Sequence, residues 1–241
     1  MLSEMKSRLG GKPKFGIVTF PGSNCDYDAF YAVKKVLEYD AQFLWHKETT
    51  FNGIDAIILP GGFSYGDYLR TGSIARFSPI MEKVIDFAEN GGIVLGICNG
   101  FQILLEAGLL PGAMQVNESL KFVCKDVYLK VENKGTPFTN AIEKDTIKIP
   151  IKHGEGNYYA DVKTVTELEK NGQILFRYSS KTGKVANTFN PNGSISNIAG
   201  IMNKTQNVMG LMPHPENACD PILRKTDGQL IFKSVAQSLF N

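Results

Sequence analysis

The chain has 241 residues, of which 43% are hydrophobic, and this content is sufficient for an ordinary buried core. It carries 26 lysine and arginine residues against 24 acidic ones, and the resulting net charge of +2, without clustered basic runs, argues against a nucleic-acid partner. The four cysteines form no C-x-x-C pair, which favours reduced thiols in a cytoplasmic protein. The first twelve residues lack an apolar signal core, so we expect no membrane partner.

From residue 14 onward, short apolar runs alternate with longer amphipathic ones, a pattern typical of βα units in a mainly parallel sheet. A first strand is predicted at 15–20, followed by a helix that runs to about Tyr39. Further strands are predicted at 41–46, 54–60 and 93–97, and a second helix at 79–90. The strand at 54–60 is apolar on both faces, as a central parallel strand should be.

The middle of the chain, residues 122–203, is richer in Thr, Lys, Asn and Gly and contains alternating stretches. These stretches predict antiparallel strands at 126–132, 146–152 and 174–179. A returning strand that enters a loop is predicted at 207–216, and an amphipathic helix at 228–240. We therefore expect an α/β fold, with a mainly parallel sheet flanked by helices and an antiparallel β extension. One domain would occupy residues 14–241, after a polar lead-in at 1–13.

Residues 91–108, GGIVLGICNGFQILLEAG, form the longest nearly charge-free run in the chain. A membrane span is disfavoured because Asn99, Gln102 and Glu106 would lie in hydrocarbon. The run instead predicts a strand, a sharp turn and a helix, and the turn has the G-x-C-x-G spacing of a nucleophile elbow around Cys98. A helix N-terminus favours the thiolate of such a cysteine, and the Asn99 N–H would face the oxyanion. The alternative is a buried structural cysteine.

Two other segments could complete a cysteine-dependent site. LPGGFSYGD follows the central strand, so the backbone N–H of Gly62 is a candidate oxyanion donor at the same carboxyl edge of the sheet. His214 lies between two prolines, and Glu216 follows it by two residues, so both side chains could project the same way. The carboxylate would orient the imidazole toward Cys98, an arrangement that suits attack on an amide. A surface turn with a salt bridge is the alternative.

Together, G-x-C-x-G-x-Q at 96–102 and H-P-E at 214–216 resemble the class I glutamine amidotransferases. FPGSNCDYDAF, LPGGFSYGDYLRTGSIARFSPIM, HGEGNY, NPNGS and GLMPHPE are similar to one branch of that family, the glutaminase subunits of phosphoribosylformylglycinamidine synthase. The resemblance extends from about Lys14 to the C-terminal helix. It implies a flavodoxin-like amidotransferase architecture and a role in de novo purine biosynthesis.

The resemblance implies that Cys98 attacks the side-chain amide of glutamine, with His214 and Glu216 completing a catalytic triad. Water would then release glutamate from a γ-glutamyl thioester, and Gln102, the motif glutamine, would contact the substrate. Because the chain lacks a G-x-x-x-x-G-K-[ST] loop, a partner must activate the ammonia acceptor. In the family, a synthase subunit uses ATP and magnesium to convert formylglycinamide ribonucleotide to formylglycinamidine ribonucleotide, and a small third subunit assists assembly. No cofactor or metal site is expected in this chain.

Other polar residues near these motifs have less defined roles. His153 and Glu155 form a second His-x-Glu pair, which we assign to a substrate loop or an interface. Asp67 and Arg70 are expected in an exposed loop beside the oxyanion glycines, in contact with the synthase or with solvent. Cys25 lacks flanking glycines, so a packing role is favoured over that of a rival nucleophile.

Three other functions stay open at this point. The first is a related cysteine peptidase or deglycase, which Gln102 and Glu216 disfavour. The second is a regulatory subunit without catalysis, which the intact Cys98 and His214 disfavour. The third is an amidotransferase subunit of another pathway, against which only the branch-specific motifs argue.

Overall fold

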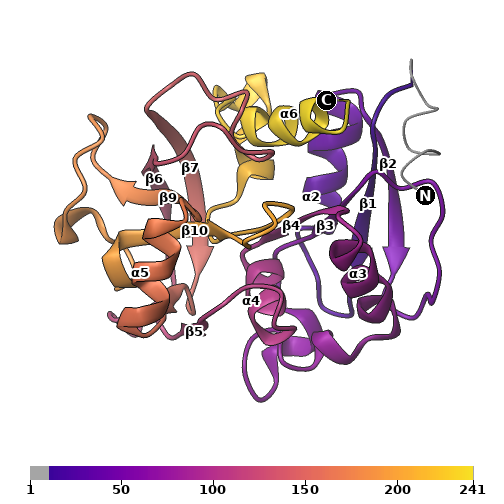
Figure 1. Ribbon diagram of the computed structural model, residues 1–241, viewed down its shortest axis with the longest axis horizontal. Coiled ribbons are helices and arrows are strands. Elements are labelled where there is room, and N and C mark those ends of the chain that lie inside the picture. Colours follow the sequence, from indigo (N-terminus) through magenta and orange to yellow (C-terminus); the bar gives the residue numbers. More distant parts are fainter. Residues whose placement is uncertain (1–10, 241) are drawn as a thin grey trace.

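The structure is a computed structural model that describes residues 11–240, so most of the predicted lead-in at 1–13 lies outside it. Its centre is a nine-stranded sheet in the order β2-β1-β3-β4-β11-β10-β9-β6-β7 (Figure 1). The strands are β1 (Lys14–Thr19), β2 (Asp40–Trp45), β3 (Ala56–Leu59), β4 (Ile93–Ile97), β6 (Val123–Val131), β7 (Thr146–His153), β9 (Ile174–Ser179), β10 (Ile198–Met202) and β11 (Val208–Leu211). A short second sheet pairs β5 (Ala113–Gln115) with β8 (Asn157–Tyr159).

The helices are α2 (Asp26–Phe30), α3 (Pro79–Glu89), α4 (Asn99–Glu106), α5 (Val162–Lys170) and α6 (Gln229–Ser238). A π-helix, η1 (Tyr31–Val36), continues α2. Short 3-10 turns are η2 (Ser64–Asp67), η3 (Ala75–Phe77), η4 (Asn187–Phe189), η5 (Ile195–Asn197), η6 (Pro215–Ala218) and η7 (Pro221–Leu223).

The predicted parallel half of the sheet is confirmed. Strands β2, β1, β3, β4 and β11 pair in parallel, and every residue of β3 and β4 is buried. Parallel strands that are covered on both faces consist of continuous apolar runs. For this reason β3 and β4 could be recognised in the sequence.

The antiparallel extension is also confirmed, and it continues the same sheet. β10 pairs antiparallel with β11 and β9, and β6 pairs antiparallel with β9 and β7. In Figure 1 these strands and α5 occupy the left of the molecule, and the parallel half lies to the right. The junction brings β7 close to the loop that follows β11, because the backbone N–H of His214 donates to the carbonyl of Pro150 at 2.8 Å.

One helix prediction was wrong in part, and one helix was missed. The helix predicted to reach Tyr39 changes from α-helical to π-helical and ends at Val36, and Glu38 then takes a left-handed backbone conformation with φ of 57°. Helix α5 was not predicted, because Val165 and Leu168 alone mark its buried face in a polar segment. Its N-terminus is capped by Asp161, whose side chain accepts a hydrogen bond from the Thr164 N–H at 2.7 Å.

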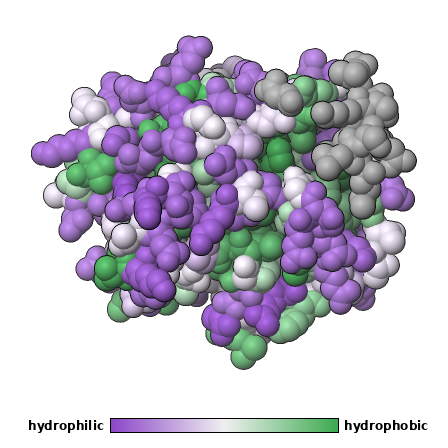
Figure 2. All heavy atoms as spheres, in the orientation of Figure 1, coloured by the Kyte–Doolittle hydropathy of each residue, from purple (hydrophilic) through white to green (hydrophobic). Residues whose placement is uncertain are grey.

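Hydrophilic residues dominate the face shown in Figure 2, and smaller hydrophobic areas interrupt them. Within residues 11–240, no helix combines the length and the apolar character needed to cross a membrane.

The carboxyl ends of the parallel strands meet at one edge of the sheet. The loop after β1 contains Cys25, the loop after β3 contains Gly62, and Cys98 follows β4 directly. His214 comes shortly after β11, which is paired with β4. This edge is the usual location of ligand sites in open α/β sheets.

Candidate active site around Cys98

Cys98 occupies the sharp turn between β4 and α4, with φ of 50° and ψ of −105°. A residue with a side chain rarely adopts this conformation, so the surrounding packing must enforce it. A Cβ atom on Gly100 would lie 1.9 Å from the Leu59 carbonyl oxygen, and one on Gly96 would lie 2.7 Å from the Gly100 carbonyl carbon. The strand, turn and helix of the predicted elbow are therefore present, and both flanking glycines are required sterically.

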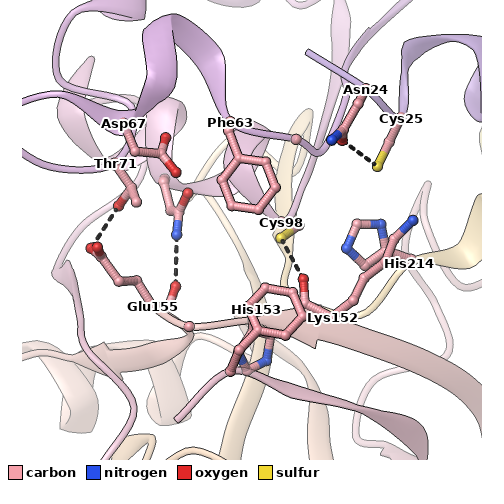
Figure 3. Close-up of a pocket in the computed structure, with 14 residues that line it drawn as sticks. Asn24, Cys25, Phe63, Asp67, Thr71, Cys98, Lys152, His153, Glu155 and His214 are labelled. Atoms are coloured by element: carbon pink, nitrogen blue, oxygen red, sulfur yellow. Dashed lines mark hydrogen bonds between the residues drawn. The ribbon is translucent and has the colours of Figure 1, made fainter. Parts of the chain in front are cut away.

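Cys98 borders a cavity of about 380 Å³. Figure 3 shows the side chains that converge on it from the loops after β1, β3 and β4 and from the end of β7. The cavity is lined by most of the residues selected from the sequence, namely Gly62, Asp67, Cys98, Gln102, His153, Glu155 and His214. The Cys98 thiol points toward the Lys152 carbonyl oxygen, at an Sγ–O distance of 4.0 Å.

The predicted His214 and Glu216 pair is formed. The Nδ1 atom of His214 lies 2.5 Å from Oε1 of Glu216, and the two side chains are 1% and 0% exposed. Gly61 lies between this pair and the thiol, because a Cβ atom there would be 2.6 Å from His214 Cε1 and 3.3 Å from Cys98 Cβ. The second ring nitrogen, Nε2, is buried and has no hydrogen-bond partner among the described residues.

The charges around His214 favour its protonated form. Burial alone lowers the pKa of the imidazole, but the negative charges of Glu216 and of Cys98 outweigh burial and raise the pKa well above its usual value. An imidazolium beside a thiol is the arrangement that supplies a proton to a leaving group.

Gly62 lines the same cavity as Cys98, and Asn99 follows Cys98 in the chain. Gly62 has φ of 134°, which favours glycine, and a Cβ atom there would lie 2.7 Å from the Asn24 backbone nitrogen. Asn99 is the first residue of α4, so the helix itself leaves its N–H without an acceptor. The two segments are joined by the Asn99 side chain, whose Oδ1 accepts a hydrogen bond from the Ser64 N–H at 3.1 Å.

Gln102 connects α4 to the loop after β7. Its Nε2 donates to the Glu155 carbonyl oxygen at 2.6 Å, and its Oε1 accepts from Asn99 Nδ2 at 2.9 Å. The side chain is buried but borders the cavity. The structure thus shows a bridging role for this residue, and contact with a substrate stays a prediction.

Asp67 and Glu155 place two carboxylates at the cavity. Asp67 accepts a hydrogen bond from Asn99 Nδ2 at 3.2 Å, and Glu155 accepts one from the Thr71 hydroxyl at 3.2 Å. Burial and the charge of Glu155 raise the pKa of Asp67 to about 6, against the opposing effect of the Asn99 hydrogen bond. Within residues 11–240, neither carboxylate pairs with a cationic side chain.

The expectation that Asp67 and Arg70 share an exposed polar loop is therefore wrong for Asp67, which belongs to the cavity. Arg70 is exposed and turns away from it, toward Glu106 at the end of α4. The Arg70 Nε and Nη2 atoms each lie 2.6 Å from an oxygen of Glu106. This two-point ion pair attaches the loop to the helix that carries Asn99 and Gln102.

His153 and Glu155 do not form a second dyad. His153 Nδ1 lies 3.2 Å from Asn117 Oδ1, and Nε2 lies 3.4 Å from Asn192 Nδ2, so the two amides satisfy both ring nitrogens. Burial, together with the positive charge of His214, lowers the pKa of His153 to about 4. The ring is therefore neutral near pH 7 and acts as part of a buried polar network.

Cys25 and Lys152 are among the cavity residues that sequence reasoning did not place there. Cys25 is buried, as a packing role requires, but it also lies beside the His214 and Glu216 pair. A usable signal existed, because Cys25 follows β1 and β1 is paired with β3, whose own loop carries Gly62.

Comparisons with known proteins identify the family of this chain. Residues 12–241 match the family described as the CobB/CobQ-like glutamine amidotransferase domain. The phosphoribosylformylglycinamidine synthase subunit PurQ of Salinibacter ruber is 57% identical over 92% of this chain and 95% of its own. The subunit of the same name from Moorella thermoacetica is 59% identical over 92% of this chain and 94% of its own.

Among solved structures, a chain in the structure of PurLQS from Thermotoga maritima has 43% sequence identity and a TM-score of 0.82. The match covers 95% of this chain and 99% of that one. Sequence and fold thus agree over nearly the full length of the matched proteins. The chain belongs to the CobB/CobQ-like glutamine amidotransferases and, within them, to the family of PurQ subunits.

Proposed function

We propose that this chain is the glutaminase subunit of a phosphoribosylformylglycinamidine synthase, in which Cys98 hydrolyses glutamine and the released ammonia passes to a synthase subunit. The observation that carries the proposal is the position of Gly61, which has the strained nucleophile Cys98 on one side and the buried His214 on the other. An amidotransferase needs this pairing of thiol and imidazole at a cavity, and a binding module has no use for it.

In the first half-reaction, the Cys98 sulfur forms a bond to the side-chain amide carbon of glutamine. His214 holds the proton of the thiol and transfers it to the amide nitrogen, so the C–N bond breaks and ammonia leaves. The N–H groups of Gly62 and Asn99 are our candidates for stabilising the oxyanion. Loss of one such donor typically costs about 2.7 to 4 kcal/mol of barrier.

In the second half-reaction, water attacks the γ-glutamyl thioester. His214 takes a proton from the water and returns it to the Cys98 sulfur as the C–S bond breaks, and glutamate is released. Glu216 keeps the imidazole in one orientation throughout, because its carboxylate accepts a hydrogen bond from the Nδ1–H group.

The carboxylates of Asp67 and Glu155 are suited to the α-ammonium group of glutamine. They lie across the cavity from His214, and among residues 11–240 they have no cation of their own. A substrate cation would relieve the repulsion that raises the pKa of Asp67. Gln102 then contributes by holding the Glu155 segment against α4, and its amide retains capacity for a substrate hydrogen bond.

The proposed partners of this chain are inferred from the names of its relatives. The names of the matched proteins describe a subunit, and the solved relative is one chain of an assembly called PurLQS. We infer a synthase subunit that holds ATP and magnesium and a small third subunit, with the complex in the cytoplasm. This chain then needs no cofactor of its own, and neither nucleic acid nor membrane is a partner.

Glutamate release measured with and without the synthase subunit tests the proposal. We expect the isolated chain to release glutamate weakly and the complex to release it much faster. The Cys98→Ala variant should release no glutamate in either state. Cys124→Ala, a change at an exposed cysteine on β6, is the matched control and should retain activity. Full activity in Cys98→Ala, or hydrolysis of peptides or glyoxal adducts in place of glutamine, would refute the assignment.

A further inference from the structure

Cys25, His214 and Glu216 form a buried cluster on one side of the cavity. One donor atom from each side chain, a thiol sulfur, an imidazole nitrogen and a carboxylate oxygen, lies within 4.8 Å of the other two. The three residues are 3%, 1% and 6% exposed. The proposed glutaminase mechanism uses His214 and Glu216 and leaves Cys25 without a role.

The cluster contains donor atoms that the protein leaves unsatisfied. His214 Nε2 and Glu216 Oε2 are both buried without a hydrogen-bond partner among the described residues. Cys25 Sγ lies 3.4 Å from Asn24 Oδ1, which is a weak interaction because a thiol is a poor donor. Buried polar atoms are normally paired, so their concentration beside a thiol indicates a site for a ligand that accepts electron pairs.

We propose that Cys25, His214 and Glu216 bind a thiophilic divalent cation, for which Zn²⁺ is the best match. Zinc takes cysteine sulfur, histidine nitrogen and carboxylate oxygen in a tetrahedral arrangement, with bonds of about 2.0 to 2.3 Å. Such bonds hold ligand atoms about 3.5 Å apart, so ligand atoms that now lie up to 4.8 Å apart have to approach, and the 2.5 Å hydrogen bond between His214 Nδ1 and Glu216 Oε1 has to open. Calcium and magnesium fit poorly, because they select sets of oxygen ligands.

The fourth coordination position is available to water, since Cys25 and His214 both line the cavity. When the metal binds, the Cys25 thiol and the His214 ring nitrogen that coordinates the metal each lose a proton to solvent, so the ligands are a thiolate and a neutral imidazole. Lys152 lines the same cavity as Cys25. Asp28, 3.7 Å from Lys152 Nζ, offsets the positive charge that would oppose a cation.

Occupation of this site removes the imidazole from proton transfer, because a ring nitrogen bound to metal cannot carry a proton. The cation is therefore an inhibitor of glutamine hydrolysis that acts beside Cys98 and does not require the Cys98 sulfur. This consequence rests on the proposed function, whereas the binding site itself does not.

Cobalt(II) serves as a spectroscopic probe of the same site. Titration of the full chain with CoCl₂ in metal-free buffer should produce the near-ultraviolet charge-transfer band of a thiolate bound to cobalt, and ZnCl₂ should displace it stoichiometrically. Cys25→Ser should abolish the band and weaken Zn²⁺ binding by about tenfold or more, as measured by competition with a chromophoric chelator. Cys25→Ala, with a folded circular dichroism spectrum, should behave in the same way.

Two variants identify the sulfur that binds. Cys98→Ser should keep the band, because the nucleophile is outside the cluster. Cys124→Ser should also keep it, although Cys124 is paired with Lys152 across β6 and β7 and is exposed to solvent. A band that survives in Cys25→Ser, or one that disappears in Cys98→Ser, would overturn the proposal, as would the absence of any thiolate band in the wild-type chain.

An activity measurement separates this inference from the proposed function. ZnCl₂ should inhibit glutamate release by the wild-type complex at concentrations that leave Cys25→Ser at least tenfold less affected, and EDTA should restore activity. A metal-free complex without glutaminase activity would refute the proposed function but leave the spectroscopic result intact. Equal inhibition of wild type and Cys25→Ser would refute the metal site alone.

Discussion

The Nδ1 atom of His214 lies 2.5 Å from Oε1 of Glu216 in a part of the protein where both side chains are fully buried. The hydrogen bond joins residues separated by a single proline in the sequence, and it holds the imidazole in one orientation. The backbone N–H of His214 is in turn bonded to Pro150 on β7, so the ring position depends on a distant strand.

Replacement of Glu216 by Gln keeps the size of the side chain and removes its charge. We expect kcat to fall about 10²- to 10⁴-fold, because an amide no longer enforces the correct tautomer of His214. The alkaline limb of the pH profile should move to lower pH, since the carboxylate helps to raise the pKa of His214. Glutamate release measured across pH checks both effects. Glu89→Gln, an exposed change on α3, is the control, and an unmoved alkaline limb would contradict the assigned role.

Asp67→Asn tests the proposed α-ammonium site. We expect KM for glutamine to rise about 10- to 100-fold with a smaller change in kcat, because a charge-assisted contact contributes about 1.5 to 3 kcal/mol. In the wild type, KM should decrease as pH rises through about 6, where Asp67 becomes ionised. Steady-state kinetics at several pH values provides the measurement, with Asp86→Asn on the outside of α3 as control. An unchanged KM in Asp67→Asn would remove this residue from substrate recognition.

Asp67→Asn should weaken the binding of glutamine but increase the stability of the folded protein. The folded pKa of Asp67 is raised from 3.8, so its contribution to stability is fully present below pH 3.8 and is lost as pH rises through about 6. Asp67→Asn removes this loss, so the variant should gain stability relative to wild type between pH 4 and pH 7. Thermal unfolding at the two pH values measures the difference, and a variant that becomes relatively less stable at pH 7 would contradict the pKa direction.

Gly61→Ala should inactivate the enzyme while leaving its fold intact. The new methyl group would lie 2.6 Å from His214 Cε1 and 3.3 Å from Cys98 Cβ, so it must push the imidazole away from the thiol. A displacement of about 1 Å in a catalytic group commonly costs about 10²-fold in rate. Glutaminase assays and circular dichroism give the comparison. Gly135→Ala, where the nearest atom would be 3.9 Å away, is the control, and a fully active Gly61→Ala would show that the two groups do not cooperate.

Tyr65→Phe should loosen the loop that carries Gly62 and Asp67. The Tyr65 hydroxyl lies 2.7 Å from His46 Nδ1 and 2.8 Å from Ser78 Oγ, and the substitution leaves these buried groups without their shared partner. We expect a loss of about 1 to 3 kcal/mol in the free energy of unfolding. Denaturant unfolding measures it against Tyr68→Phe, a change at a 74% exposed side chain. Equal stability of the two variants would mean that the network does not anchor the loop.

Local patterns were sufficient for much of the fold. The buried strands β3 and β4 are continuous apolar runs, and the elbow around Cys98 is specified by glycines two positions before and after it. Helix α5 and the end of η1 were missed for the opposite reason. Their boundaries depend on one capping side chain and on a left-handed residue, Glu38, and neither produces a periodic signal.

The polar residues of the cavity also differ in whether a local sequence pattern predicted their positions. His214 and Glu216 share one short motif, so their pairing was predictable. Asp67 was expected in an exposed loop, and its partial burial near Glu155 depends on the loop after β7 meeting the loop after β3 at the cavity. Cys25 and Glu216 are remote in sequence, and so no motif spacing indicated a metal site.

The sequence by itself determined which residues have the chemistry, namely a thiol in a turn that only glycines permit and an imidazole with a carboxylate two residues away. These features are local, since steric limits on a few consecutive residues produce them. Tertiary structure alone decided which distant groups share the cavity, how far each is removed from water, and therefore how its pKa shifts. The physical reason is that burial and charge interactions depend on distances in space, which the packing of β7 and the loop after β11 against the parallel sheet creates.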